Sequence, residues 1–183
     1  MKLSRREFSK VLVASAAALG LDGKVGGRPR PVDAAAGIGR PVEGGNREEL
    51  LSLIYRYSYT YDAKDLDGFI ALFTEDAVWE VYSVGSSVPL LSLGSRDALR
   101  SFVDQRMAQL RTQGVQSRHY QTNTILTTSA PRSAQGVTML LLTWQFSSET
   151  AARIMNTGYY RDHFVDTIDG WRFARREAYT DQH

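Results

Sequence analysis

The sequence predicts an α+β domain in which three helices are followed by a curved, mostly antiparallel sheet. Apolar residues recur with helical spacing from residue 46 onward, and the pattern changes to strand-like runs after Gly114. Asp169-Gly170, flanked by two such runs, is typical of a β-hairpin. A curved sheet wrapped over three helices would enclose one pocket between the two layers.

Each predicted helix has an identifiable start. Asn46 is a suitable N-cap for a helix over 46–63. Asp65 or Asp67 can cap a short second helix, and Ser95 opens a third. The apolar stripe of the third helix consists of Leu99, Phe102, Val103, Met107 and Leu110.

Alternation and turn residues predict five strands. They span residues 77–82, 117–128, 136–148, 153–167 and 171–179. A turn is expected between Pro131 and Gly136. The segment 137–146 is almost continuously apolar, which favours a central position in the sheet.

The first 36 residues are predicted to be a twin-arginine export signal, with a basic disordered tail as the alternative. The motif over 4–10 contains the arginine pair, a phenylalanine and a lysine, and the apolar run over 11–21 is too short to span a bilayer. Small residues at 34–36 offer a cleavage site. We therefore expect a periplasmic or secreted protein without a stable membrane anchor, with a flexible lead-in over 37–45 and one domain over 46–183.

Composition excludes several classes of function. The chain carries a net charge of +2, but residues 1–36 hold seven Lys/Arg and three acids, so the remainder carries −2. A weakly acidic domain gives no support for nucleic-acid binding. The absence of cysteine excludes disulfides, thiolate catalysis and cysteine-ligated metals. No nucleotide-binding motif or metal-spaced His/Asp cluster is present, so we expect neither a cofactor nor a metal.

One aspartate and one histidine are candidates for general acid–base chemistry. Asp62 follows Ser58 by four residues, which places it on the apolar face of the first helix, an unusual position for an acid. The strand period of two puts His119, Gln121 and Asn123 on one face. A carboxylate bonded to one imidazole nitrogen makes the other nitrogen a better base. Alternatively, Asp62 caps the next turn and His119 is a hydrogen-bonded core histidine.

Further polar residues allow two interpretations each. Tyr57 and Tyr61 share a helix face, where their phenols could act as acids that protonate or hold a substrate oxygen, or could pack at the core edge. Arg161 could anchor a substrate or lie solvated on its strand. Arg175-Arg176 is expected to pair with helix acids rather than to bind a ligand.

Five segments together resemble the SnoaL-like branch of the nuclear transport factor 2-like superfamily. They are residues 61–67, 73–79, 118–123, 158–162 and 170–173, and the resemblance covers about 46–180. It implies a cone-shaped fold with a deep pocket. The superfamily includes scytalone dehydratase, a dehydrochlorinase, bile-acid dehydratase, ketosteroid isomerases and polyketide cyclases.

The resemblance also implies roles for particular residues. Asp62 and His119 match the aspartate and histidine that are paired in the dehydratases and the dehydrochlorinase. Tyr61 and Tyr57 match tyrosines of the scytalone dehydratase and bile-acid dehydratase patterns. The residues expected to contact a substrate in the pocket are Asn123, Arg161, Trp144, Tyr82 and Tyr159.

Two departures argue against scytalone itself as the substrate. Trp144-Gln145 stands near the place of a second pocket histidine, and Tyr159-Tyr160-Arg161 replaces a Ser-x-Asn segment. The expectation is therefore a cofactor-independent lyase of the elimination type, acting on a hydrophobic cyclic or aromatic small molecule, with C–C cleavage as one variant. The alternatives are an isomerase with the same pair, or a non-catalytic ligand-binding or small-subunit protein. Analogy with family members suggests a homodimer or homotrimer.

Overall fold

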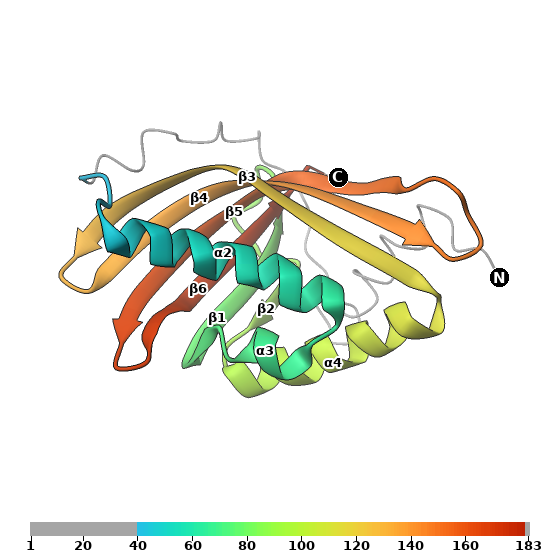
Figure 1. The fold of residues 1–183 in the computed structure, drawn as a ribbon, viewed down its shortest axis with the longest axis horizontal. Helices are drawn as coiled ribbons and strands as arrows, with labels where there is room; N and C mark the ends of the chain where they lie inside the picture. The colour runs from blue at the N-terminus through green and yellow to red at the C-terminus, as the bar shows by residue number, and fades with distance from the viewer. Residues whose placement is uncertain (1–39, 182–183) are drawn as a thin grey trace.

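The computed structural model describes residues 40–181, which form three helices and six strands (Figure 1). In chain order the elements are α2 (Gly45–Ala63), α3 (Leu66–Ile70), β1 (Phe73–Ser83), β2 (Leu91–Leu93), α4 (Arg96–Thr112), β3 (Val115–Ala130), β4 (Ser133–Phe146), β5 (Arg153–Thr167) and β6 (Gly170–Thr180). The export signal predicted for residues 1–36 lies outside the described residues.

The six strands form one open, curved sheet in the order β2-β1-β6-β5-β4-β3. Neighbours are antiparallel except β1 and β6, which run parallel. The helix α2 crosses one face of the sheet, while α3 and α4 lie near β1 and β2 (Figure 1). The predicted α+β class, with three helices on a curved and mostly antiparallel sheet, is confirmed.

The chain alternates between two faces of this sheet. The inner face is the one that the helices cover, and the outer face is its opposite. Tyr160 and Arg176 point to the inner face, where both contact the ring of Tyr57 in α2. Their sequence neighbours Tyr159 and Arg175 therefore point to the outer face.

The helix starts agree with the sequence at two of three places. Asp65 caps α3 by accepting from Gly68 N at 2.9 Å, and Ser95 caps α4 by accepting from Ala98 N at 3.1 Å. The prediction of Asn46 as the first cap is wrong. The cap is Gly44, which makes no side-chain cap bond and has a φ of 62°, a conformation that glycine adopts without strain.

Several details of the strands differ from the prediction. The strand β1 begins at Phe73, four residues early. The short β2 lies in a segment for which no strand is predicted, because three residues carry no periodic signal. The strand β4 begins at Ser133, so the turn is confined to the two residues before it. The prediction of a central position for 137–146 is wrong, because β4 lies between β5 and the edge strand β3.

The core fills the space between helices and sheet. It is rich in aromatic rings, and each fully buried apolar side chain contributes about 1.5–3 kcal/mol relative to exposure. Its most buried members from the helices and strands include Leu50, Ile54, Phe69, Phe73, Leu99, Met107, Phe164 and Phe173. The rings of Phe73 and Phe173 lie 5.2 Å apart at the centre of this cluster.

The end of the predicted flexible lead-in is attached to the sheet. Val42 N donates to Leu126 O at 3.3 Å, and Thr128 N donates to Arg40 O at 2.8 Å. Val42 is only 6 % exposed and belongs to the core. Within residues 40–181 no helix is long and apolar enough to cross a membrane.

Candidate active site

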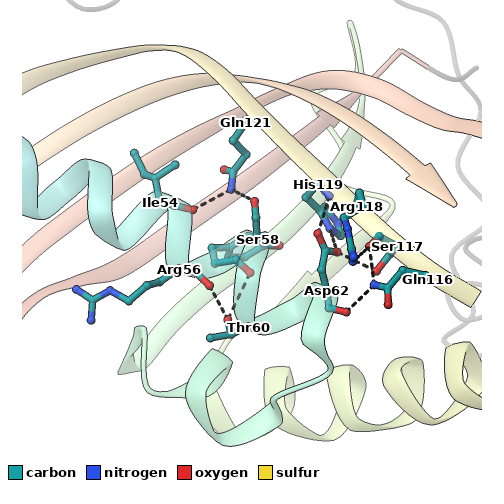
Figure 2. A network of polar contacts seen from close by, with 11 residues as sticks. Ile54, Arg56, Ser58, Thr60, Asp62, Gln116, Ser117, Arg118, His119 and Gln121 are labelled. Carbon is teal, nitrogen blue, oxygen red and sulfur yellow. Dashed lines mark hydrogen bonds and ion pairs between the residues drawn. The ribbon is translucent and has the colours of Figure 1, made fainter. Parts of the chain in front are cut away.

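The last turn of α2 brings Asp62 to the strand β3, where its side chain is buried. One carboxylate oxygen, Oδ1, lies 2.7 Å from Nδ1 of His119 and accepts from Ser117 Oγ at 2.8 Å. The other, Oδ2, accepts from the backbone N–H of His119 at 2.8 Å. Figure 2 shows the three residues converging from helix and strand. The structure thus brings together the two residues that the sequence separates by 57 positions.

The charge of Asp62 decides which imidazole nitrogen carries the proton. Burial raises the pKa of this carboxyl group, but contacts with His119 and the hydrogen bond from Ser117 outweigh burial and hold the pKa below its usual value of 3.8. An ionised carboxylate only accepts hydrogen bonds, so Nδ1 of His119 must be the donor. Nε2 is then the basic nitrogen, and no group within residues 40–181 hydrogen-bonds to it.

Two glutamines of β3 fix the helix against the strand (Figure 2). Gln116 Nε2 donates to the backbone oxygen of Asp62 at 2.9 Å. Gln121 Nε2 donates to Ile54 O at 2.9 Å and to Ser58 Oγ at 2.6 Å. These bonds satisfy polar groups at the helix surface and hold Asp62 in register with His119.

The two tyrosines predicted as acids pack against the imidazole on its core side. The ring centroids of Tyr61 and His119 are 5.0 Å apart at 75°, and those of Tyr57 and His119 are 6.3 Å apart at 89°. Burial raises the pKa of Tyr61 to about 12, against the opposing charge of Arg106. Burial likewise raises the pKa of Tyr57, against the charge of Arg176. Both phenols are therefore neutral at physiological pH.

A groove of about 720 Å³ runs between α2 and β3 and reaches Asp62 and His119. This volume is within the usual range of small-molecule sites. The groove is open to solvent. The lining residues are Tyr55, Ser58, Tyr59, Asp62, Ala63, Gln116, Arg118, His119, Tyr120, Gln121 and Thr122.

Two predicted substrate contacts, Asn123 and Trp144, do not line this groove. Asn123 has a φ of 55° and lies in a β-bulge between Thr122 and Ile125, so the alternation that would place it beside His119 is broken. Its side chain is exposed. Trp144 does lie on the inner face, but it is 6 % exposed and packs in a small cluster with Leu110.

Three other predicted contacts lie on the outer face, so their assignment to the same pocket is wrong. Tyr82, Tyr179 and Tyr159 stack in a row across three strands, with centroids 4.9 Å apart at both steps. The guanidinium of Arg161 lies 5.1 Å from the ring centroid of Tyr179. Alternation along a strand divides the side chains into two sets, one for each face of the sheet. The sequence could not predict which set would lie on the outer face, because that depends on which set packs against α2.

Sequence reasoning missed the buried ion pair behind the site. Arg176 is 0 % exposed and forms a bidentate pair with Asp162 at 2.7 and 2.8 Å, not with a helix acid as predicted. Its guanidinium lies 4.0 Å from the ring centroids of both Tyr57 and Tyr160, and Nη2 donates to Gln121 Oε1 at 3.0 Å. Burial raises the pKa of Asp162, and the adjacent cation opposes that shift.

Arg176 therefore connects the sheet to the helix that carries Asp62. A buried arginine has to be paired, and Asp162 lies directly opposite it on the adjacent strand β5. The hairpin turn at Asp169-Gly170 is the sequence signal that sets these strands side by side. Residue pairs counted from that turn without a bulge would not place Asp162 opposite Arg176. A bulge between His163 and Phe164 shifts the register of β5 against β6 by one residue. Within residues 40–181 no group of three or more His, Asp or Glu is placed to hold a metal ion.

The fold is similar to that of a solved nuclear transport factor 2-like protein from Novosphingobium aromaticivorans, which is 24% identical, with a TM-score of 0.61 over 74% of this chain and 81% of that one. The sequence profile of the SnoaL-like domain family matches residues 45–177, and the chain belongs to that family. No curated protein sequence matches the chain significantly.

Solved structures support the same architecture. A candidate scytalone dehydratase from Novosphingobium aromaticivorans is 24% identical, with a TM-score of 0.61 over 75% of this chain and 87% of that one. Aln2 from a Streptomyces species is 20% identical, with a TM-score of 0.65 over 78% and 95%. The β subunit of a candidate aromatic-ring-hydroxylating dioxygenase from N. aromaticivorans is 17% identical, with a TM-score of 0.61 over 74% and 89%. At these identities the likeness concerns the fold.

Proposed function

We propose that the protein is a cofactor-independent lyase in which His119, oriented by Asp62, is the general base. The observation that carries the proposal is the 2.7 Å contact between Asp62 Oδ1 and His119 Nδ1 at the wall of the groove. In the neutral imidazole this contact places the proton on Nδ1, and Nε2 has no hydrogen-bond partner among residues 40–181. A cyclic or aromatic small molecule in the groove would present an acidic C–H bond to that nitrogen.

The elimination proceeds on protein groups alone. Nε2 takes a proton from carbon, the C–H electrons form a double bond, and the bond to a leaving hydroxyl on the adjacent carbon breaks. The imidazolium then returns the proton to that oxygen, which departs as water. Asp62 stabilises the imidazolium because its carboxylate is ionised and already bonded to Nδ1.

The tyrosines have a different part in this proposal from the one expected from the sequence. Neither Tyr57 nor Tyr61 lines the groove, and both present their rings to the imidazole. We assign Tyr61 to holding the imidazole ring in place. An isomerase would use the same base and return the proton to another carbon of the substrate.

A turnover screen tests the proposal. Full-length protein and the His119→Ala variant would be incubated with cyclic alcohols, cyclic halides and phenolic diols, with product detection by mass spectrometry. We expect turnover of at least one class to fall by about 10²–10⁴-fold in the variant. His163→Ala is the matched control, because His163 bonds to Ser133 Oγ and lies outside the groove. Equal turnover by wild type and His119→Ala would refute the proposal.

A further inference from the structure

One cation at the wall of the groove has no acidic partner among residues 40–181. Arg118 is exposed, lines the groove and lies next to His119 in β3. Its Nη1 donates to the backbone oxygen of Ser117 at 2.9 Å, and it forms no ion pair within residues 40–181. A guanidinium carries five donors, so four remain for a ligand.

The surroundings of Arg118 are positive rather than negative. Asp62 is the single acid among the groove-lining residues, and its oxygens are already bonded to Ser117 and His119. Lys64 lies at the end of α2, and Arg111 Nη2 donates to its backbone oxygen at 2.8 Å. The pKa of Lys64 is lowered by burial and by the charges of Arg111 and Arg118, against the charge of Asp62. Arg111 and Arg118 therefore both lie close enough to Lys64 to act on its charge.

The same groove carries exposed aromatic side chains. Tyr55 is 47 % exposed, Tyr59 77 % and Tyr120 50 %, and all three are lining residues. Tyrosines pack their rings on a flat apolar ligand and leave their hydroxyls in water. Exposed aromatic residues gathered around a concave surface mark a binding site rather than chance exposure.

We propose that the substrate of this site is an aromatic or cyclic molecule that carries an anionic group, and that Arg118 binds this group. The proposal rests on the groove being the substrate site of the proposed lyase. The anion would be a carboxylate or phenolate, for which the planar guanidinium offers paired donors. The ring of the molecule would lie among Tyr55, Tyr59 and Tyr120. Arg118 is then a specificity-determining residue of the groove.

Helix-end stabilisation is the competing explanation for these cations. It applies to Arg111, which bonds to a carbonyl at the end of α2. It does not apply to Arg118, which belongs to a strand and, within the described part of the chain, bonds only to the carbonyl of its own neighbour. Arg118 is therefore the residue to vary.

A pair of isosteric probes tests the proposal by binding alone. 2-Naphthoate and 2-naphthamide share a ring system and differ in charge, and their dissociation constants for the full chain would be measured by fluorescence titration at low and high salt. We expect the anion to bind at least about tenfold more tightly, corresponding to about 1.4 kcal/mol. Added salt should reduce the difference, because the contact is exposed.

Variants of Arg118 test whether this residue causes the tighter binding of the anion. Arg118→Gln should bring the two dissociation constants within about twofold, whereas Arg118→Lys should retain part of the preference. Arg161→Gln is the matched control, since it removes an equal charge from the outer face and should leave the preference unchanged. Equal binding of the two probes by wild type, binding of neither, or an unchanged preference in Arg118→Gln would overturn the proposal.

The binding test of the anion site and the turnover test of the lyase proposal can fail independently. An Arg118-dependent preference, measured without turnover, supports the anion site even if His119→Ala turns over substrate normally. Loss of turnover in His119→Ala together with an unchanged preference in Arg118→Gln leaves the lyase standing and removes the anion site.

Discussion

At the scale of single residues, the position of Asp62 is the strongest indication of where the candidate site lies. An acid on the apolar side of an amphipathic helix is costly unless it is bonded, and here both carboxylate oxygens have donors. All of these donors belong to Ser117 and His119. The helix pattern showed that Asp62 would be buried, but it could not show that the donors would come from β3, because that depends on which strand lies beside α2.

Replacing Asp62 should change how stability depends on pH. The pKa of Asp62 is depressed in the fold, so its contribution to the free energy of unfolding is complete above pH 3.8 and is lost as the pH falls through the lower folded value. Asp62→Asn should remove this acid-side slope, as measured by urea unfolding at a series of pH values. Asp104→Asn, an exposed acid on α4, is the control, and an acid slope identical in wild type and Asp62→Asn would contradict the account.

Replacing Tyr61 should separate ring packing from proton donation. Tyr61→Phe keeps the ring that contacts His119 at 5.0 Å, so we expect turnover within about threefold of wild type once a substrate is known. Tyr61→Ala removes the ring and should lower turnover about 10²-fold or more through a displaced imidazole. If Tyr61→Phe alone costs about 10²-fold, the phenol is the acid expected from the sequence and the packing role is wrong.

At the scale of elements, β3 is both a sheet edge and a wall of the site. Its first half faces α2 through Ser117, His119 and Gln121, and its second half pairs with residues 40–42 at the same edge. The bulge at Asn123 separates the two halves. Period-two reasoning placed the first half correctly and failed at the bulge, because one inserted residue exchanges the faces of everything that follows.

The contact between β5 and β6 gives a test at this scale. Gly158 has a φ of 154°, and a Cβ on it would lie 2.0 Å from the backbone oxygen of Tyr179. Gly158→Ala should therefore reduce the free energy of unfolding by about 1–3 kcal/mol, measured by urea denaturation. Gly94→Ala, where a Cβ would meet nothing within 4 Å, should change it by less than about 0.5 kcal/mol. Similar losses in both variants would show that the strands do not approach this closely.

At the scale of the whole molecule, a buried ion pair joins the sheet to the helix of the site. Arg176 lies between aromatic rings of α2, β5 and β6 and reaches α2 through Gln121. Taking two charges out of water costs several kcal/mol, which the paired geometry offsets. Such a pair adds little net stability, and in some proteins buried ionic groups specify how the layers pack. We therefore expect it to determine the position of α2 over the sheet.

Replacing one partner of this ion pair should lower the free energy of unfolding more than replacing both partners. Arg176→Met leaves Asp162 buried without its partner and should lower the free energy of unfolding by about 3–5 kcal/mol. The double variant Arg176→Met, Asp162→Leu should recover at least about half of that loss, because no uncompensated charge remains. Urea unfolding of the three proteins measures the difference. Additive losses in the double variant would contradict a direct interaction between the two side chains.

The sequence predicted the architecture better than it predicted the site. Helix caps, the hairpin and the order of elements are local features, and Ser95, Asp65 and the turn before Gly170 were recoverable for that reason. The pairing of Asp62 with His119 was anticipated from residue type and position. The outer-face location of Tyr82, Tyr159 and Arg161 was not, because strand faces are set by tertiary packing.

The most direct test of the central claim is the tautomer of His119. Nitrogen-15 NMR of histidine-labelled protein at pH 8 should show a proton on Nδ1 and none on Nε2, and Asp62→Asn should abolish this preference while the His163 signals stay unchanged. A proton on Nε2 in the wild type, or the same tautomer in Asp62→Asn, would contradict the claim that Asp62 prepares His119 as a base.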